Sequence, residues 1–407
     1  MKHQNAYSFF LSIILVFTFI SKIEAQDAWS KLSNFPNGLR ARGVAFSIGD
    51  RVYFGQGTPG GINNINDFWA YNVKEDTWDS ISTIPGNSLI GATGFSYKNF
   101  GFVGLGQSSA TVFSRAFYRY NSDSNTWVRI ADFPGAGRNY AASFVIGNTA
   151  YVGCGNRGTS TLKDFYAFNM ENNVWTKLTD LPGLARSSAF SFSTQGKGYV
   201  LCGGNYTQSG GDVLLKDVYE FDPKTNNWTQ KGDFPGENRE DGASFSFESF
   251  GIIALGQNET IYSNEVWEYN SSTDTWINRA SFTANRRRNI AFCVNKNQGY
   301  ILGGTLGTVS TSEVYSYKPL STSTSEVGNQ LKDLKTFPNP FSTSFNITGL
   351  NNVNNYRYDI FDLKGVTLFQ DVLLTEEINI DLSSGVYFLR IKDSKNSVDK
   401  TLVLYKQ

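Results

Sequence analysis

The chain has 407 residues, of which 40% are hydrophobic and 15% aromatic, so it can bury a substantial core in one large β domain or in two domains. Thirty-six basic and thirty-six acidic residues cancel, which leaves no overall charge that would indicate binding to nucleic acid or to an anionic membrane. Any charged binding site must therefore be local.

Residues 1–25 have the three-part form of a secretory signal peptide. Lys2 lies near the start, the apolar run FFLSIILVFTFI follows at 9–20, and a short polar stretch ends at Ala25. A membrane-spanning helix needs about 20 apolar residues, and this run is shorter. We therefore predict cleavage after Ala25, export of the chain, and a mature protein without a transmembrane segment.

Cleavage would also remove His3, the only histidine of the chain. The mature protein would then have no histidine for a catalytic triad, for a zinc or copper site or for an imidazole base. The cysteines Cys154, Cys202 and Cys293 are odd in number, which does not suit a disulfide framework, so we predict buried free thiols. We expect neither a metal nor another cofactor.

Six tryptophans that follow polar turns mark an internal repeat of about 50 residues. They are Trp29, Trp78, Trp127, Trp175, Trp228 and Trp276. Between them the same phrases recur in order: a turn of FPxG type, a strand of small residues (RNYAASF, 138–144), a second strand that ends on glycine (YVGCG, 151–155) and a third strand (KDVYEFD, 216–222). With the short strand that carries the tryptophan, each repeat has four strands.

Four short strands in a period of about 50 residues are typical of a β-propeller blade, and this is the period of kelch repeats. The phrases resemble kelch repeats, although the double glycine after the second strand is complete only at Gly303–Gly304 and, one place shifted, at Gly203–Gly204. The resemblance implies an all-β fold in which residues 26–319 form a six-bladed kelch-type β-propeller.

The two ends of the repeat region complete one another. Trp29 stands before the first full repeat, whereas the sixth repeat stops at EVYSYKP (313–319) without a tryptophan strand. The segment AWSKLSNFP (28–36) should therefore supply the outer strand of the last blade and close the ring without an unpaired edge.

A Ser/Thr-rich linker at 320–330 precedes a change of pattern. Residues 331–407 contain alternating strands, enough for a small C-terminal β-sandwich. The phrases PNP, DLKG and LSSGVYFL and a lysine-bearing last strand resemble the C-terminal sorting domain of the type IX secretion system. The resemblance implies a Bacteroidetes-type bacterium, recognition of residues 331–407 by the type IX secretion machinery, and a protein that is secreted or displayed on the outer-membrane surface. We expect the mature chain to be a monomer.

The start of the first strand lines the channel of a propeller, and arginine dominates this position. The six repeats have Arg42, Leu89, Arg138, Arg186, Arg239 and Arg288 there. At the start of the third strand they have Asp67, Ala116, Asp164, Asp217, Glu265 and Glu313. The repeat that lacks the arginine also lacks the carboxylate, which favours structural ion pairs. A ring of guanidinium groups around a channel mouth is also suited to an anionic ligand, so this second interpretation stays open beside the structural one.

These residues and the polar side chains near them predict a binding module for a glycan or an acidic protein segment. The candidate ligand contacts besides the five arginines are Tyr140, Arg157, Gln107, Asn156, Asn205 and Gln257. No catalytic residue is assigned, and we expect a binding protein rather than an enzyme.

The alternative is a carbohydrate-active enzyme, such as an epimerase that resembles the sialic acid mutarotases. That resemblance calls for a glutamate just beyond a second-strand glycine. The residues at those places are Thr58, Gln107, Asn156, Gly204, Gln257 and Thr305, and none is acidic. Elsewhere, Glu237, Glu240 and Asp241 surround Arg239 and could supply a general base, although an exposed charged turn explains them as well.

Overall fold

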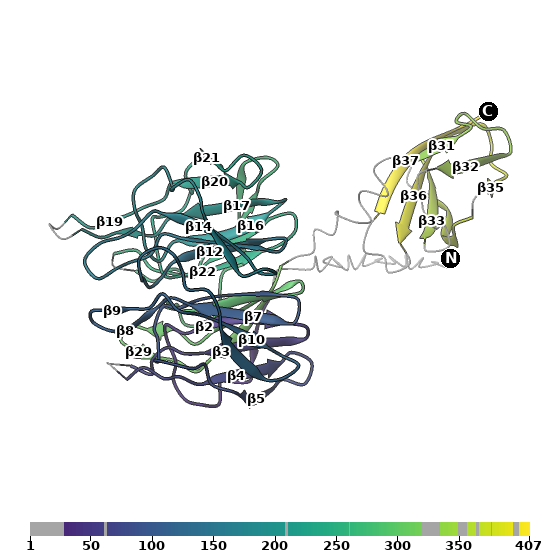
Figure 1. The fold of residues 1–407 in the computed structure, drawn as a ribbon. Helices are drawn as coiled ribbons and strands as arrows, with labels where there is room; N and C mark the ends of the chain where they lie inside the picture. The colour runs from purple at the N-terminus through teal and green to yellow at the C-terminus, as the bar shows by residue number, and fades with distance from the viewer. Residues whose placement is uncertain are drawn as a thin grey trace, which may run out of the picture.

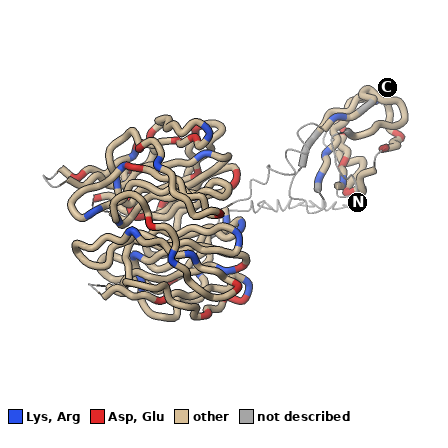
Figure 2. Tube along the Cα trace, in the orientation of Figure 1, with Lys and Arg blue, Asp and Glu red and all other residues tan. Residues whose placement is uncertain are grey.

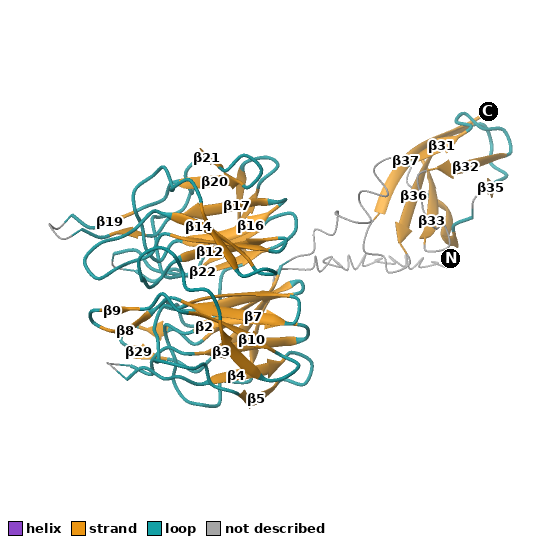
Figure 3. Ribbon diagram, in the orientation of Figure 1, coloured by secondary structure: helices purple, strands orange, loops and turns teal. Residues whose placement is uncertain are grey.

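The protein is seen here in a computed structural model that describes residues 28–60, 63–207, 211–259, 261–319, 334–348, 356–363, 366–375, 377–393 and 399–407. Every regular element in these ranges is a β-strand (Figures 1 and 3). The predicted signal peptide and the linker at 320–330 lie outside the described residues.

Six four-stranded antiparallel sheets follow one another along the first part of the chain. The first contains β2 (Val44–Ile48), β3 (Arg51–Gly55), β4 (Phe68–Asn72) and β5 (Thr77–Ile81). The second contains β6 (Thr93–Tyr97), β7 (Phe100–Gly104), β10 (Phe117–Asn121) and β11 (Thr126–Arg129). The third contains β12 (Ala142–Ile146), β13 (Thr149–Gly153), β14 (Phe165–Asn169) and β15 (Val174–Lys177).

The next three sheets repeat this order of strands. The fourth contains β16 (Phe190–Thr194), β17 (Lys197–Leu201), β20 (Val218–Asp222) and β21 (Asn227–Gln230). The fifth contains β22 (Ala243–Ser246), β23 (Gly251–Ala254), β24 (Val266–Asn270) and β25 (Thr275–Arg279). The sixth contains β26 (Ala291–Asn295), β27 (Gln298–Leu302), β30 (Val314–Lys318) and β1 (Ala28–Leu32).

Short hairpins extend three of the sheets beyond the end of the second strand. They are β8 (Gln107–Ser109) with β9 (Val112–Phe113), β18 (Gly204–Asn205) with β19 (Val213–Leu214), and β28 (Thr305–Leu306) with β29 (Val309–Ser310). The labelled hairpin strands lie on the same side of the molecule (Figure 1).

Neighbouring sheets pack face to face through aromatic side chains. Phe144 and Tyr151 of the third sheet share a buried cluster with Tyr219 and Phe221 of the fourth. Phe144 fits because Gly198 faces it, since a Cβ atom on that glycine would lie 2.0 Å from the phenylalanine ring. The second strands are covered on both faces by this packing, which explains why they are continuous apolar runs rather than alternating ones.

The N-terminal strand completes the last sheet, as the sequence predicted. β1 pairs with β30 in antiparallel register from Ala28↔Lys318 to Leu32↔Val314. Trp29 packs against Phe282 and Tyr317, with ring centroids 4.8 and 4.9 Å away. The first and last strands of the repeat region therefore hold each other in place.

Two further sheets form the C-terminal part. One contains β31 (Lys335–Phe337), β32 (Ser344–Thr348) and β35 (Glu377–Asn379). The other contains β34 (Thr367–Leu373), β33 (Tyr356–Asp362), β36 (Gly385–Asp393) and β37 (Asp399–Lys406). Both contribute to one buried cluster, which joins Phe345 and Ile378 of the first sheet to Ile360, Leu389 and Leu404 of the second.

Removal of residues 28–36 should destabilise the whole repeat region. The deletion uncovers β30 and removes the partly buried ring of Trp29 and the buried ring of Phe35, and loss of a buried ring costs about 3–5 kcal/mol. We expect the melting temperature to fall by about 10 °C or more, since 1 kcal/mol shifts the midpoint of a large domain by about 2–4 °C. The control is Lys31→Ala, which removes only the surface ion pair with Glu313. A deletion variant that melts like the parent protein would contradict the closure.

Candidate functional site

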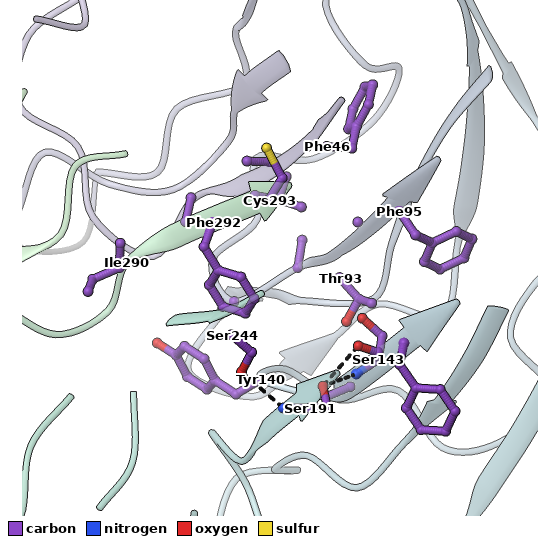
Figure 4. A pocket seen from close by; sticks show the side chains of 18 of the residues that line it. Phe46, Thr93, Phe95, Tyr140, Ser143, Ser191, Ser244, Ile290, Phe292 and Cys293 are labelled. Atoms are coloured by element: carbon purple, nitrogen blue, oxygen red, sulfur yellow. Dashed lines mark hydrogen bonds between the residues drawn. The ribbon is translucent and has the colours of Figure 1, made fainter. Parts of the chain in front are cut away.

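A cavity of about 320 Å³ runs along the first strands of all six sheets, β2, β6, β12, β16, β22 and β26, and we call it the channel (Figure 4). Serines on its wall join neighbouring sheets. Ser191 Oγ donates to the carbonyl oxygen of Ser143 (2.8 Å) and accepts from the backbone N–H of that residue (3.0 Å). The backbone N–H of Ser191 in turn donates to Ser244 Oγ (3.1 Å). The hydroxyl groups of Ser191 and Ser244 therefore hold neighbouring sheets together.

One end of the channel is bounded by a closed circle of backbone hydrogen bonds, which we call the mouth. Its six residues precede the six first strands and are Arg42, Gly91, Tyr140, Ser188, Asp241 and Asn289. Each backbone N–H donates to the carbonyl oxygen of the previous member, at 2.8–3.2 Å, and Arg42 donates to Asn289 to close the circle. All six lie in the left-handed region, with φ between 51° and 60°, although only Gly91 is a glycine. The circle therefore holds five side-chain-bearing residues in an uncommon conformation.

The arginine position predicted from the sequence lies two residues before the mouth. The six residues there are Arg40, Leu89, Arg138, Arg186, Arg239 and Arg287. The predicted register is therefore wrong in two repeats. The arginine of the first repeat is Arg40 and not Arg42, two residues earlier, and that of the sixth is Arg287 and not Arg288, one residue earlier. The physical reason is that 39–42 (LRAR) and 286–288 (RRR) each offer more than one arginine, and no proline turn fixes the register of the latter run.

The five arginines at this position form ion pairs inside their own sheets. Arg138 Nη1 and Nη2 donate to Asp164 Oδ1 (2.6 Å) and Oδ2 (2.8 Å), and Nη1 also donates to the carbonyl oxygen of Cys154 (2.8 Å). The guanidinium lies 4.8 Å from the ring of Phe133, which belongs to the FPxG turn. Burial alone would raise the pKa of Asp164, but the hydrogen bond and charge of Arg138 outweigh it and keep that pKa below its usual value.

The same pairing recurs in four other sheets. The pairs are Arg40–Asp67, Arg186–Asp217, Arg239–Glu265 and Arg287–Glu313. These are the five carboxylates that the sequence predicted as partners, and the second sheet has Leu89 and Ala116 instead. Because the arginine side chains are at most 3% exposed, the geometry favours the structural interpretation for Arg138, Arg186 and Arg239.

Arg42, in contrast, belongs to the mouth, and Arg288 directly precedes its member Asn289. Among the described residues, Arg42 forms no ion pair and no side-chain hydrogen bond, and its side chain lines the channel. Arg288 lies 5.7 Å from the ring of Tyr262, and its buried Nε has no partner. Tyr140 also lines the channel (Figure 4), and burial raises the pKa of its phenol.

The remaining predicted ligand contacts lie above the mouth or away from it. Gln107 accepts a hydrogen bond from Asn139 (2.8 Å), and Asn205 donates to Thr161 and to the carbonyl oxygen of Ala185. Arg157 is exposed in the loop of the third sheet, and Asn156 is held there by backbone pairing. Arg42 and Tyr140 thus line the channel together, whereas Arg288, Arg157 and Asn205 do not line it.

Glu240 and Asp241 are not exposed. The sequence alone allowed two interpretations for them, a general base or an exposed charged turn. Asp241 lines the channel, and Glu240 is 6% exposed, whereas Glu237 lies on the surface. Glu240 accepts hydrogen bonds from the hydroxyl group of Tyr206 and from Gln257 Nε2 (3.3 Å). Burial and the neighbouring carboxylate of Asp241 raise the pKa of Glu240 to about 7. Burial also raises the pKa of Asp241, against the opposing effect of Ser188, Arg288 and Arg42.

Comparison with known families accounts for both parts of the chain. Residues 100–247 match the KLHDC2/KLHL20/DRC7 Kelch-repeats domain, and residues 335–405 match the Secretion system C-terminal sorting domain. The chain carries kelch repeats and a type IX sorting domain. The sorting domain indicates export through the type IX system to the cell surface or the extracellular space, and it implies interaction with that machinery.

The solved structure of YjhT resembles the kelch propeller. It matches with a TM-score of 0.60 at 17% identity, over 72% of this chain and 98% of that chain. At this identity the likeness shows the fold alone. No curated protein matches the chain.

The described residues limit two further kinds of site. They contain no helix that is long and apolar enough to cross a membrane. Within the same ranges, no group of three or more histidine, cysteine, aspartate or glutamate side chains is placed to hold a metal ion. Basic and acidic positions are interspersed along the chain trace (Figure 2).

Replacement of Arg138 and of Arg42 should separate the structural arginines from those of the mouth. Arg138→Met removes a buried guanidinium group and leaves the partly buried Asp164 without its partner, so the free energy of unfolding should fall by about 2–3 kcal/mol. Arg42→Met breaks no ion pair, so the change should stay within about 0.5 kcal/mol. Urea unfolding measures both. Equal stability of the two variants would overturn the structural assignment.

Glu240 should make stability depend on pH in a defined window. The folded protein keeps the proton up to about pH 7, whereas the unfolded chain loses it near the ordinary value of 4.5. Between these values the folded state binds more protons, so the free energy of unfolding falls as pH rises, by at most about 1.4 kcal/mol per pH unit. Glu240→Gln should show a shallower decline, since only Asp241, whose pKa is also raised, then contributes to it, and the exposed control Glu237→Gln should retain the full decline. Parallel pH curves for wild type and Glu240→Gln would contradict the assignment.

Proposed function

We propose that the mature protein is a secreted or surface-displayed binding module in which residues 26–319 form a closed six-bladed kelch propeller. The mouth of this propeller binds a glycan or an acidic protein segment. A signal peptide at 1–25, a linker at 320–330 and a sorting domain with a β-sandwich fold at 331–407 complete the proposed organisation. The observation that carries the proposal is the contrast between two groups of arginines. Five form ion pairs with carboxylates inside their sheets, whereas Arg42 and Arg288 form none among the described residues.

The mouth has the groups that a polar ligand needs. A guanidinium group without a carboxylate partner, such as that of Arg42, is suited to a carboxylate, phosphate or sulfate of a ligand. Asp241 and Asn289 can accept hydrogen bonds from hydroxyl groups, and Asn289 can also donate. The channel volume of about 320 Å³ lies at the lower end of the range for small-ligand sites, about 300–1,000 Å³. A small polar group, or the end of a larger molecule, therefore fits.

One observation favours a second candidate, a carbohydrate-active epimerase of the mutarotase kind. The carboxyl group of Glu240 accepts a hydrogen bond from Gln257, which occupies one of the places where that resemblance calls for a glutamate. With its pKa raised to about 7 by burial and by Asp241, this group is suited to proton transfer near neutral pH. We rank it second because Glu240 does not line the channel.

The test is ligand screening of the secreted protein on arrays of glycans and acidic peptides, followed by substitution. Arg42→Ala should weaken binding about 10- to 100-fold, the scale of a lost charge-assisted hydrogen bond of about 1.5–3 kcal/mol. The matched control is Arg157→Ala, which removes an arginine from the exposed loop, and it should leave the affinity unchanged. Binding that depends on Arg157 and not on Arg42 would move the site away from the mouth. Turnover of a sugar anomer by wild type, lost in Glu240→Gln, would establish the second candidate instead.

A further inference from the structure

The side chains of the mouth divide into a neutral half and a charged half. The second, third and fourth sheets contribute Gly91, Tyr140 and Ser188. The fifth, sixth and first contribute Asp241, Asn289 and Arg42, with Arg288 beside Asn289 in the chain. A ligand that fills the mouth must therefore offer an uncharged face on one side and charged or hydroxyl groups on the other.

Tyr140 forms the wall of the neutral half. Its ring lies over the bare backbone of Gly91, because a Cβ atom on that glycine would be only 2.8 Å from Tyr140 Cε1. The side chain is partly exposed, and its hydroxyl group forms no hydrogen bond with another described residue. An aromatic ring with a free polar tip suits a ligand whose apolar face stacks on it while its edge stays polar.

Two charged side chains, Arg42 and Asp241, line the channel together with Tyr140. Burial is the main cause of the raised pKa of the Tyr140 phenol, but four charges also act on it. Arg42 and Arg288 lower this pKa, and Asp241 and Glu240 raise it. Charges of both signs thus lie within electrostatic reach of one aromatic ring. Arginine is suited to a carboxylate, and Asp241 is suited to accept hydrogen bonds from hydroxyl groups.

The circle of hydrogen bonds restricts how a ligand enters. The six residues are joined without a gap, so the mouth has no lateral opening through which a polymer could lie across the channel. The volume of about 320 Å³ suits one small unit. An internal unit of a chain would need both of its linkages to pass through the mouth, whereas a terminal unit needs only one.

We infer that the mouth binds the terminal residue of an acidic glycan end-on, with the sugar ring stacked on Tyr140, its carboxylate at Arg42 and its hydroxyl groups at Asp241. This inference rests on the proposed function and narrows it from glycans or acidic peptides to the carboxylated end of a sugar chain. The selectivity comes from the shape of the mouth together with the placement of one aromatic ring beside one free arginine.

The test uses the full secreted chain and three immobilised tetrasaccharides that differ in one position. The first ends in glucuronic acid, the second carries glucuronic acid only internally, and the third is neutral throughout. We expect the first to bind at least about tenfold more tightly than the other two, and free glucuronate to compete. Arg42→Met and Tyr140→Ala should each reduce binding of the first about tenfold or more, while the control Arg157→Ala leaves it unchanged.

The outcomes separate the inference from the function on which it rests. Equal binding of terminal and internal glucuronic acid would overturn end-on recognition but leave binding at the mouth intact. Binding of acidic peptides alone would overturn the sugar class. Binding of any probe that is insensitive to Arg42→Met and Tyr140→Ala would overturn the mouth itself as the site. If Tyr140→Ala does not fold, as judged by its melting curve, the comparison of the tetrasaccharides on wild type and Arg42→Met decides.

Discussion

The circle of six backbone hydrogen bonds at the mouth fixes both the architecture and the candidate site. Each member must adopt a left-handed backbone for its N–H to reach the previous carbonyl group, and this conformation sets the direction in which its side chain leaves the chain. None of these six residues belongs to a buried apolar cluster of the described sheets. The six positions accordingly hold an arginine, a glycine, a tyrosine, a serine, an aspartate and an asparagine.

The position two residues earlier has the opposite character. There the guanidinium groups are buried and need a carboxylate, a carbonyl oxygen and an aromatic face, all of which the same sheet supplies. Arg40 and Arg42 are separated by one residue, yet the first is part of the interior of a sheet and the second faces the channel. Arg287 is likewise paired with Glu313 inside its sheet, whereas the neighbouring Arg288 lies over the ring of Tyr262. In the first sheet, backbone conformation rather than residue type thus assigns each arginine its role, since Arg42 has a left-handed backbone (φ 58°) and Arg40 does not.

Much of the fold could be predicted because the repeat imposes it. The tryptophan spacing, the glycine after the second strand and the incomplete last repeat led directly to the strand order and to the pairing of β1 with β30. The arginine partners could be predicted as well, since one repeat lacks both the arginine and the carboxylate and has Leu89 and Ala116 in their places. When two positions lose their charged residues in the same repeat, a single sequence already indicates that the two side chains contact each other in the other repeats.

The details of the site could not be predicted from the same signals. The left-handed positions carry five different side chains besides glycine, so no residue pattern marks them. Glu240 lies in a strongly charged phrase, GENRED, which is typical of a surface turn, and its burial depends on Tyr206 and Gln257 from neighbouring loops. One clue was available: four of the five arginines lie 26 or 27 residues before the third-strand acid, as in Arg40–Asp67, Arg138–Asp164 and Arg287–Glu313. The exception is Arg186, which lies 31 residues before Asp217.

The direction of β30 has a consequence for how the molecule is held. This strand starts next to Leu32 and Leu302, close to the contacts that Thr311 makes with Arg40 and Gly304, and runs away from the mouth to Lys318. Ala28, the first described residue, lies beside Lys318 at that far end. Both covalent connections therefore leave from the rear of the propeller. A chain segment attached at this end could connect the molecule to a surface without passing over the mouth, so the mouth would stay accessible.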